Sequence, residues 1–542
     1  MCIMAKLELY IYLMSFLIYG YATLQSLLLL SMVVTFGCFC YCFVKRILYW
    51  QWLGVRQTFP IYISGNNREF QIEKQNYPDL IIRSYNQCRD ARYIGVCQFS
   101  KPTLMIRDPK LIELVTIKDS GKFRNHQCSI PEVDSLWAMG CPFSTDEDRS
   151  HMRSILTPFF TNNSLKIMFR VMSETSENFV NHFLNKNQDL IELEMFDTVT
   201  RYVNDVMATS VFGTEVDSLK KPDNEMYFMG RKATDSTGIL RKIKLYCYST
   251  LPTIFKFLEM SLISREVTRF FDRMIGNVIR ERFVNRNIRY DMIQLAMEAI
   301  EKNERTEEES FEKVTIGDIT NSKMTYHDIA AQLMTILFAG YNSTSAALCF
   351  TSHELAVNPD IQKKLRKEIE ETLEECGGKL TYESLMKMKY LDMIVSESLR
   401  KWPSTIASYR RCTNPYTILP EKADEGLLRI RNDTQILIPI FGIHRDPAYY
   451  PDPDCFDPER FSDENKTNLV PFTYMPFGNG PRDCVGSSYA LLTIKLLLFH
   501  LLTHYELVTV EKTSIPLKLS KKSCITPTAE GGFWLGLKRI QK

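Results

Sequence analysis

Near its C-terminal end the chain reads Phe477-Gly478-Asn479-Gly480-Pro481-Arg482-Asp483-Cys484-Val485-Gly486. The apolar run that follows predicts a helix from Ser488 to about His504. Gly478 and Gly480 allow backbone conformations closed to other residues, so the loop can lie flat against a large group. A cysteine at a helix start meets unpaired backbone N–H groups and the positive end of the helix dipole, which favour its thiolate. Arg482, two residues before the sulfur, is placed to hold an anionic group.

Two interpretations of Cys484 are open on these residues alone. A lone cysteine favours a buried structural role, because cysteine is among the most buried residue types. A thiolate, a flat glycine loop and an arginine occurring together instead suit a haem with its carboxylate tails. The whole ten-residue frame is much more demanding than a lone cysteine, and it favours the haem.

This frame resembles the haem-binding loop of the cytochrome P-450 monooxygenases, Phe-Gly-x-Gly-x-Arg-x-Cys-x-Gly, with no position missing. The resemblance implies that Cys484 ligates the iron of haem b and that Phe477, Arg482 and Gly486 contact the cofactor. It extends over residues 50–542 and implies a mainly α fold with a smaller β region, preceded by an N-terminal transmembrane anchor. Residues 353–359 and 390–403 resemble the insect microsomal branch of the family.

A second informative stretch lies in the middle of a long helix predicted from about Tyr326 to Val357. Serine and threonine in a helix commonly bond back to the preceding turn, and in isolation Ser343 and Thr344 favour that interpretation. The resemblance identifies this segment with the family's oxygen-activating helix, in which an acid and a threonine precede a further hydroxyl residue. Here Asn342 stands at the acid and Ser343 at the threonine. The resemblance implies catalytic roles for Asn342, Ser343 and Thr344, although Asn342 cannot pass a proton at neutral pH.

A third signal is the pair Glu397 and Arg400, which are three residues apart and therefore share one helix face. As an exposed pair it would contribute little to stability. Arg460 follows in the sequence Asp457-Pro458-Glu459-Arg460-Phe461. The resemblance implies that Glu397, Arg400 and Arg460 form a buried structural triad behind the haem.

Three further cofactor contacts come from the resemblance. Arg410 matches the family's arginine that meets a haem carboxylate, with Arg411 as the competing residue. His444 falls in a His-Arg-Asp-Pro turn and is expected to order that turn or touch a haem carboxylate. Arg153 matches the arginine of a Trp-x-x-x-Arg pattern in which Arg149 replaces the tryptophan.

The rest of the chain is consistent with one large helical domain. Helical periodicity is present at residues 168–184, 198–212, 264–286 and 390–401, whereas short runs at 80–82 and 95–99 and the segment 434–440 predict strands. A net charge of +2 gives no support for a nucleic-acid partner. The 15 cysteines are odd in number and scattered, so neither a disulfide framework nor a zinc module is indicated.

The first residues predict a membrane anchor. Residues 24–44 are apolar and uncharged and, at about 21 residues, long enough to cross a bilayer. Lys45 and Arg46 follow at once, which predicts that the body faces the cytosol. We therefore divide the chain into an anchor at 1–48 and a haem-thiolate catalytic domain at 49–542. The resemblance implies that the membrane is that of the endoplasmic reticulum (microsomal).

The expected function is insertion of one oxygen atom from O₂ into a hydrophobic small molecule, a xenobiotic or an endogenous lipid or hormone. The resemblance implies NADPH-derived electrons from a flavoprotein reductase, with a b-type cytochrome as a further candidate partner. The pocket is expected around residues 129–144, 228–246, 338–344 and 404–409. Because the acid is replaced by Asn342, the alternative is a haem protein that catalyses a rearrangement or dehydration, or that sequesters ligands with weak turnover.

Overall fold

The structure is a computed structural model. It describes residues 14, 26, 29–37, 44, 48–58, 75–98, 101–124, 153, 156–235, 241, 243–244, 247–248, 257–285, 288–289, 291–298, 326–522 and 526–541.

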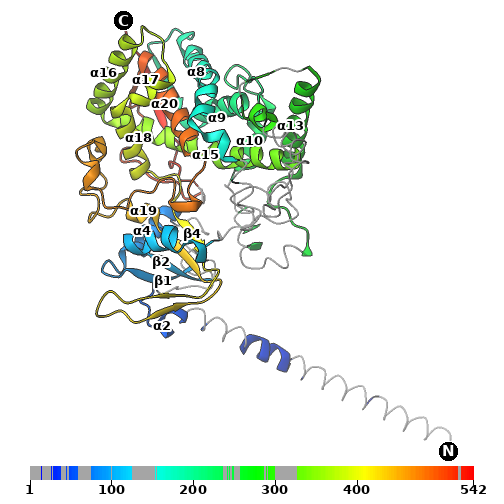
Figure 1. Cartoon of the computed structure of the whole chain (residues 1–542), viewed down its shortest axis with the longest axis vertical. Coiled ribbons are helices and arrows are strands. Elements are labelled where there is room, and N and C mark those ends of the chain that lie inside the picture. The colour runs from blue at the N-terminus through cyan, green and yellow to red at the C-terminus, as the bar shows by residue number, and fades with distance from the viewer. Residues whose placement is uncertain are drawn as a thin grey trace, which may run out of the picture.

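A long apolar helix, α15 (Tyr326–Val357), runs through the helical part of the molecule (Figure 1). It packs against α9 (Met195–Ser210), α10 (Glu225–Thr234), α18 (Lys389–Lys401) and α20 (Ser487–His504). A helix that is apolar on most of its faces belongs in a core. Further α-helices with described bounds are α2 (Tyr49–Trp52), α4 (Tyr77–Asn86), α5 (Pro109–Glu113), α8 (Asn162–Leu184), α13 (Arg265–Asn285), α16 (Pro359–Glu375), α17 (Tyr382–Lys387) and α19 (Ile440–Ile443).

A smaller β region lies beside the helices, next to α2 and α4 (Figure 1). Its sheet has the strand order β1-β2-β7-β4, and β2 pairs in parallel with β7 while the other pairs are antiparallel. These strands are β1 (Tyr93–Gln98), β2 (Lys101–Ile106), β4 (Ser408–Arg411) and β7 (Gln435–Ile438). Two smaller sheets are formed by β3 (Leu190–Glu194), β9 (Trp534–Arg539) and β8 (Tyr505–Val508), and by β5 (Tyr416–Ile418) and β6 (Leu428–Ile430). The predicted mainly α fold with a smaller β region is confirmed.

One predicted strand is wrong. Leu80, Ile81 and Ile82 lie in helix α4. Asn76 caps this helix by accepting a hydrogen bond from the Asp79 N–H at 2.8 Å, and proline stands in its first turn. A short apolar run has no periodicity that separates a strand from a buried helix, so the cap decides.

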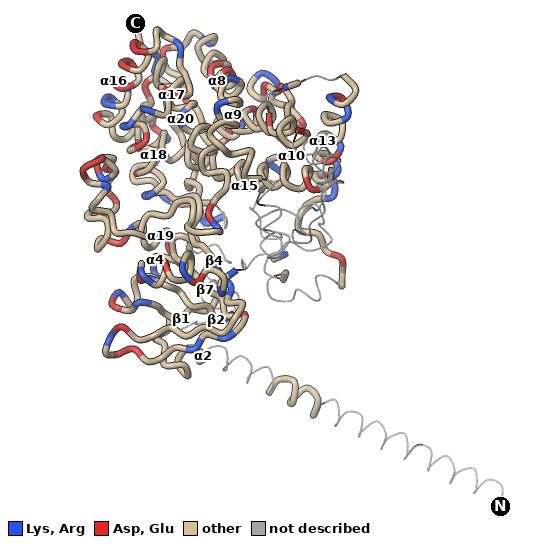
Figure 2. The backbone as a smooth tube through the Cα atoms, viewed as in Figure 1, with Lys and Arg blue, Asp and Glu red and all other residues tan. Residues whose placement is uncertain are grey.

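The predicted anchor falls mostly outside the described residues. The described part, residues 29–37, is helical, and Leu30, Val33 and Phe36 on it are exposed. This helix carries no charged residue, whereas basic and acidic residues are interspersed over the body (Figure 2). Within the described ranges one helix, His327–Val357, is long and apolar enough to cross a membrane, but most of it is buried inside the molecule.

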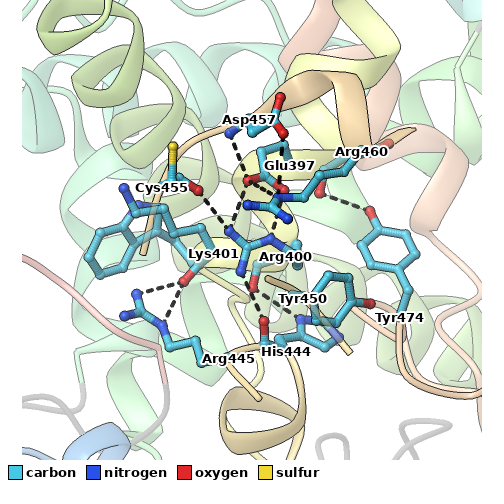
Figure 3. A network of polar contacts seen from close by, with 12 residues as sticks. Glu397, Arg400, Lys401, His444, Arg445, Tyr450, Cys455, Asp457, Arg460 and Tyr474 are labelled. Atoms are coloured by element: carbon cyan, nitrogen blue, oxygen red, sulfur yellow. Dashed lines mark hydrogen bonds and ion pairs between the residues drawn. The ribbon is translucent and has the colours of Figure 1, made fainter. Parts of the chain in front are cut away.

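A buried polar network joins α18 to the segments that follow it (Figure 3). Glu397 and Arg400 are fully buried, and Arg400 donates two hydrogen bonds to the Glu397 carboxylate, at 2.7 and 2.8 Å. Arg400 also donates to the carbonyls of His444, at 2.9 Å, and Cys455, at 3.3 Å. Glu397 accepts from the Asp457 N–H at 3.0 Å. Burial raises the pKa of Glu397, and the hydrogen bonds and charge of Arg400 oppose that shift.

Arg460 is the looser third member of this network. Its Nε lies 3.5 Å from Glu397 Oε1, an ion-pair distance without hydrogen-bond geometry. Its Nη2 instead donates to the Asp452 carbonyl at 3.1 Å. The structure thus brings the predicted triad together, with Glu397 and Arg400 as its tight pair.

His444 connects the network to the loop that carries Cys484. Its Nε2 accepts a hydrogen bond from the Met475 N–H at 2.9 Å. The ring proton is therefore on Nδ1, which lies 3.2 Å from the Arg400 carbonyl and donates to it. Burial, with the charge of Arg400 as the next cause, lowers the pKa of His444 to about 3. A neutral imidazole thus joins the C-terminal turn of α18 to the start of the Cys484 loop.

Replacing Glu397 with alanine should destabilise the protein strongly, because Arg400 would be left buried without its anion. We expect the free energy of unfolding to fall by about 3–5 kcal/mol, measured by urea denaturation of the full chain. The matched control is Glu174→Ala, which breaks an exposed pair with Arg170 at 2.9 Å and should cost about 0–1 kcal/mol. Equal costs for the two variants would contradict the structural role.

His444 should also make stability depend on pH. The unfolded chain takes up a proton on this histidine near pH ~6.5, whereas the folded chain does so only near 3. The free energy of unfolding should therefore fall as pH drops below ~6.5. In His444→Gln this dependence should be flatter by up to about 1.4 kcal/mol per pH unit, measured by urea denaturation between pH 7.5 and 5. The control is His327→Gln at an exposed position, and equal slopes for the wild type and His444→Gln would refute the prediction.

Candidate functional site

The loop before α20 is held in a shape that only glycine permits. Gly478 and Gly480 have φ values of +76° and +75°. A Cβ on Gly480 would lie 2.0 Å from the backbone oxygen of Thr116, so no larger residue fits there. The Cys484 N–H donates to the Phe477 carbonyl at 2.8 Å, which closes the loop and turns the cysteine toward the interior.

A cavity of about 360 Å³ lies between this loop and α15. Its wall is mostly apolar, with hydroxyl groups from α15 and from the segment after α18. The lining residues are Arg153, Leu156, Phe160, Met207, Thr335, Ile336, Ala339, Gly340, Ser343, Thr344, Ala347, Leu399, Ser404, Thr405, Ser408, Ile440, Pro476, Phe477, Gly478, Arg482, Asp483, Cys484, Val485, Gly486, Tyr489, Ala490 and Ile494.

Helix α15 presents one stripe to the cavity. Residues 335, 336, 339, 340, 343, 344 and 347 line it, a spacing that places them on one helix face. Ala339 is exposed in the middle of this otherwise buried helix, because small side chains there open onto the cavity. Ser343 and Thr344 both lie on this stripe, although neighbouring residues of a helix point about 100° apart.

The side chains of Ser343 and Asn342 bond to different parts of the molecule. The Ser343 hydroxyl donates to the Ala339 carbonyl at 2.6 Å, the helix back-bond that serine commonly makes. Asn342 is absent from the cavity wall, and its Nδ2 donates to the Thr234 carbonyl of α10 at 2.8 Å. The amide is bonded to another helix, which favours a structural role over the catalytic role predicted for Asn342.

The Cys484 thiol opens onto the cavity while protein surrounds it. Burial raises its pKa above the ordinary value, and the Asp483 carboxylate adds to the shift, while a backbone hydrogen bond from Gly486 and the charge of Arg153 oppose it. The helix start therefore does not by itself make Cys484 a thiolate. A metal cation coordinated by the sulfur would supply the missing stabilisation.

Four arginines were candidates for anion binding. Arg153 and Arg482 line the cavity, and Arg153 also forms an ion pair with Asp483. Arg410 is buried beside the loop and donates to the Tyr409 carbonyl at 2.8 Å, but it is not on the cavity wall. Arg411 is half-exposed and pairs with Asp433 at 2.9 Å. Of this competing pair, Arg410 is the buried one.

The other candidates separate into two groups. Phe477 and Gly486 line the cavity with Cys484, whereas His444 is buried away from it with both ring nitrogens bonded to backbone. This supports the turn-ordering role for His444. The network of Glu397, Arg400 and Arg460 is connected to the start of this loop through His444, which bonds to Arg400 and to Met475.

Some lining residues were not anticipated. Met207 on α9 lines the cavity next to α15, and a Cβ on Gly340 would lie 2.4 Å from its Cε. Tyr489 on α20 also lines the cavity. Nothing in the sequence marks either residue, because helical periodicity identifies a buried face without naming its neighbour. Of the expected pocket segments, 129–144 lies outside the described residues, and the described residues of 228–246 do not reach the wall.

The residues present fit a haem. One thiol opens onto the cavity and two arginines line it. The small residues Ala339 and Gly340 leave space beside α15 for a flat group. The positive φ values and the close approach of Gly480 to Thr116 flatten the loop that would face the ring.

The sequence matches the family model described as "Cytochrome P450" over residues 57–533. It is 41% identical over 492 residues to "Cytochrome P450 9e2" of Blattella germanica, covering 87% of this chain and 90% of that protein. It is 34% identical over 518 residues to "Probable cytochrome P450 9f2" of Drosophila melanogaster, with 91% and 97% covered. "Cytochrome P450 6k1" of Blattella germanica is 31% identical over 516 residues, with 94% and 97% covered.

These matches confirm the resemblance drawn from the Cys484 loop and its assignment to the insect branch. They span the α15 stripe, the Glu397 network and the loop alike. The chain therefore belongs to the cytochrome P450 family and is a monooxygenase of the oxidoreductase class, with relatives among insect members of that family.

Proposed function

We propose that the protein inserts one atom of O₂ into a hydrophobic small molecule bound in the cavity between Cys484 and α15. The observation that carries the proposal is that the Cys484 thiol and the hydroxyl-bearing residues Ser343 and Thr344 line one cavity from opposite elements. One site would thereby combine a metal ligand, hydroxyl groups that can transfer protons, and an apolar space for the substrate.

The haem would be held by residues of this chain on two sides. Cys484 would supply the thiolate ligand, and Phe477 and Gly486 of the same loop would contact the haem. Arg153 and Arg482 would hold its carboxylate tails. A bound haem b would supply the iron at which O₂ is activated, with the thiolate favouring O–O cleavage. Arg410, next to the loop but off the cavity wall, is a weaker candidate for the same carboxylates.

On the oxygen side, Ser343 and Thr344 would hold and pass protons. A hydroxyl both donates and accepts, so each can join a chain of ordered water. In the described part of the chain, Asp483 is the single carboxylate on the cavity wall, and it pairs with Arg153. Proton delivery would therefore depend on hydroxyls and water.

The lining favours an apolar substrate with limited polar functionality. Leu156, Ile336, Ala347, Leu399 and Ile440 supply apolar surface. A xenobiotic or an endogenous lipid or hormone has this character.

The family and the N-terminal segment support a proposed redox partner and a proposed location. NADPH-derived electrons would come from a flavoprotein reductase, and a b-type cytochrome is a further candidate donor. The exposed apolar helix at 29–37, with Lys45 and Arg46 after the apolar run, supports an anchor in the endoplasmic reticulum membrane and a body on the cytosolic side.

A second candidate function is a haem-dependent rearrangement or dehydration, or ligand sequestration with weak turnover. The observation that favours it is that the described cavity stripe of α15 carries no acid. Asn342, which stands at the acid position, is an amide and bonds to α10 instead. Turnover of an organic hydroperoxide without NADPH would favour the rearrangement. NADPH-dependent oxygenation at ~1 s⁻¹ or more would exclude sequestration.

Cys484→Ala should abolish the thiolate-specific absorption band of the reduced, CO-bound protein, because no sulfur would remain to ligate the iron. Difference spectra of membranes containing the full chain measure this. Cys455→Ala, at another exposed thiol, is the matched control and should keep the band. A normal band in Cys484→Ala would disprove ligation by this residue.

Ser343→Ala combined with Thr344→Val should reduce product formed per NADPH consumed, by roughly 10²-fold if these hydroxyls carry the proton transfer. An alkoxycoumarin probe provides a fluorescent readout of product. Ser345→Ala is the matched control, because Ser345 is buried on the same helix, bonds back to the Tyr341 carbonyl at 2.7 Å and is not on the cavity wall. An unchanged yield in the double variant would place proton delivery elsewhere.

A further inference from the structure

Helices α10 and α15 are joined at one junction. Asn342 Nδ2 donates to the Thr234 carbonyl at 2.8 Å, and the buried Tyr341 hydroxyl donates to the Tyr227 carbonyl at 3.2 Å. Beside these bonds the Tyr341 ring packs closely on the α10 backbone, since a Cβ on Gly230 would lie 3.0 Å from that ring. Tyr341 and Asn342 precede Ser343 in the chain, and neither of them lines the cavity.

The Asn342 bond caps the C-terminus of α10. The last carbonyls of a helix have no partner within it and carry partial negative charge. Here Arg241 donates to the Ala233 carbonyl at 3.0 Å, and Asn342 takes the Thr234 carbonyl. Both carbonyls are thus met by donors from outside α10.

We propose that Asn342 is a positioning residue, whose amide caps α10 and thereby holds the central turn of α15 with Ser343 and Thr344 facing the cavity. The inference rests on the proposed function only in taking this cavity as the reactive site. The junction itself is independent of turnover.

The amide is the chemically suitable group for this role. Asn342 donates through Nδ2, whereas an ionised carboxylate has acceptors only and would face the Thr234 oxygen and the negative end of α10. An acid at this position would therefore push the helices apart, although it could pass protons. In this chain, a hydrogen bond between α15 and α10 takes the place of the acid.

The test is hydrogen–deuterium exchange on the full-length protein, loaded with haem, comparing Asn342→Asp, Asn342→Ala and Asn342→Gln. We expect the amides of residues 231–235 to exchange about fivefold faster in Asn342→Ala and faster still in Asn342→Asp, whose charge adds repulsion. Asn342→Gln keeps an amide donor and should restore most of the protection.

Asn358→Asp is the matched control, since Asn358 Nδ2 donates to the Glu354 carbonyl at 2.8 Å at the far end of the same helix. It should change exchange near residue 354 and leave 231–235 unchanged. Unchanged exchange at 231–235 in Asn342→Asp, or equal exchange in the Gln and Asp variants, would overturn the proposal.

A second readout separates positioning from general stability. Rebinding of CO to the reduced protein after flash photolysis reports access to the cavity, and we expect a several-fold faster rate in Asn342→Asp, with Asn342→Gln and Asn358→Asp close to the wild type. An unchanged rate in Asn342→Asp would show that the junction does not shape the cavity. If the chain binds no haem, the proposed function fails, but exchange at 231–235 in the haem-free protein still tests the cap.

Discussion

The buried ion pair between Glu397 and Arg400 is the interaction on which the metal-ligand side of the site depends. Two charges without water are costly, and such a pair is tolerated only when its remaining hydrogen-bonding capacity is used. Here the His444 and Cys455 carbonyls and the Asp457 N–H use it. The pair is therefore a point to which separate backbone segments are fixed. One of them carries His444, which bonds to Met475 at the start of the loop that presents Cys484.

The oxygen side depends on one helix having two different neighbours. The cavity stripe of α15 is made of small and hydroxyl-bearing residues, while Tyr341 and Asn342 on another face bond to α10. Asn342 and Ser343 are neighbours in one helical turn, so under our proposal a displacement at the α10 contact would move the cavity wall. Residues that never touch a substrate can thus influence the geometry at Ser343 and Thr344.

The sequence was sufficient for features with strong local signals. Periodicity located α15 and α20, and the Cys484 loop matched a known motif. The structure explains one glycine of that motif, because a Cβ on Gly480 would clash with the backbone oxygen of Thr116. The sequence failed at residues 80–82, where a short apolar run is ambiguous and Asn76 decides. The sequence also could not predict where the Asn342 side chain points. The rotation of a helix about its axis is set by its tertiary partners, and here Asn342 bonds to Thr234.

The bonding of Ser343 sets the direction in which it can handle a proton. Its hydroxyl proton is given to the Ala339 carbonyl, so toward the cavity the oxygen is an acceptor. To donate into the cavity, the hydroxyl must rotate and give up that bond, at a net cost of about 1 kcal/mol. The carbonyl left behind is on a cavity-lining residue, where water can replace the lost partner. The absence of an acid at position 342 therefore removes a proton store but leaves a hydroxyl that can switch between accepting and donating.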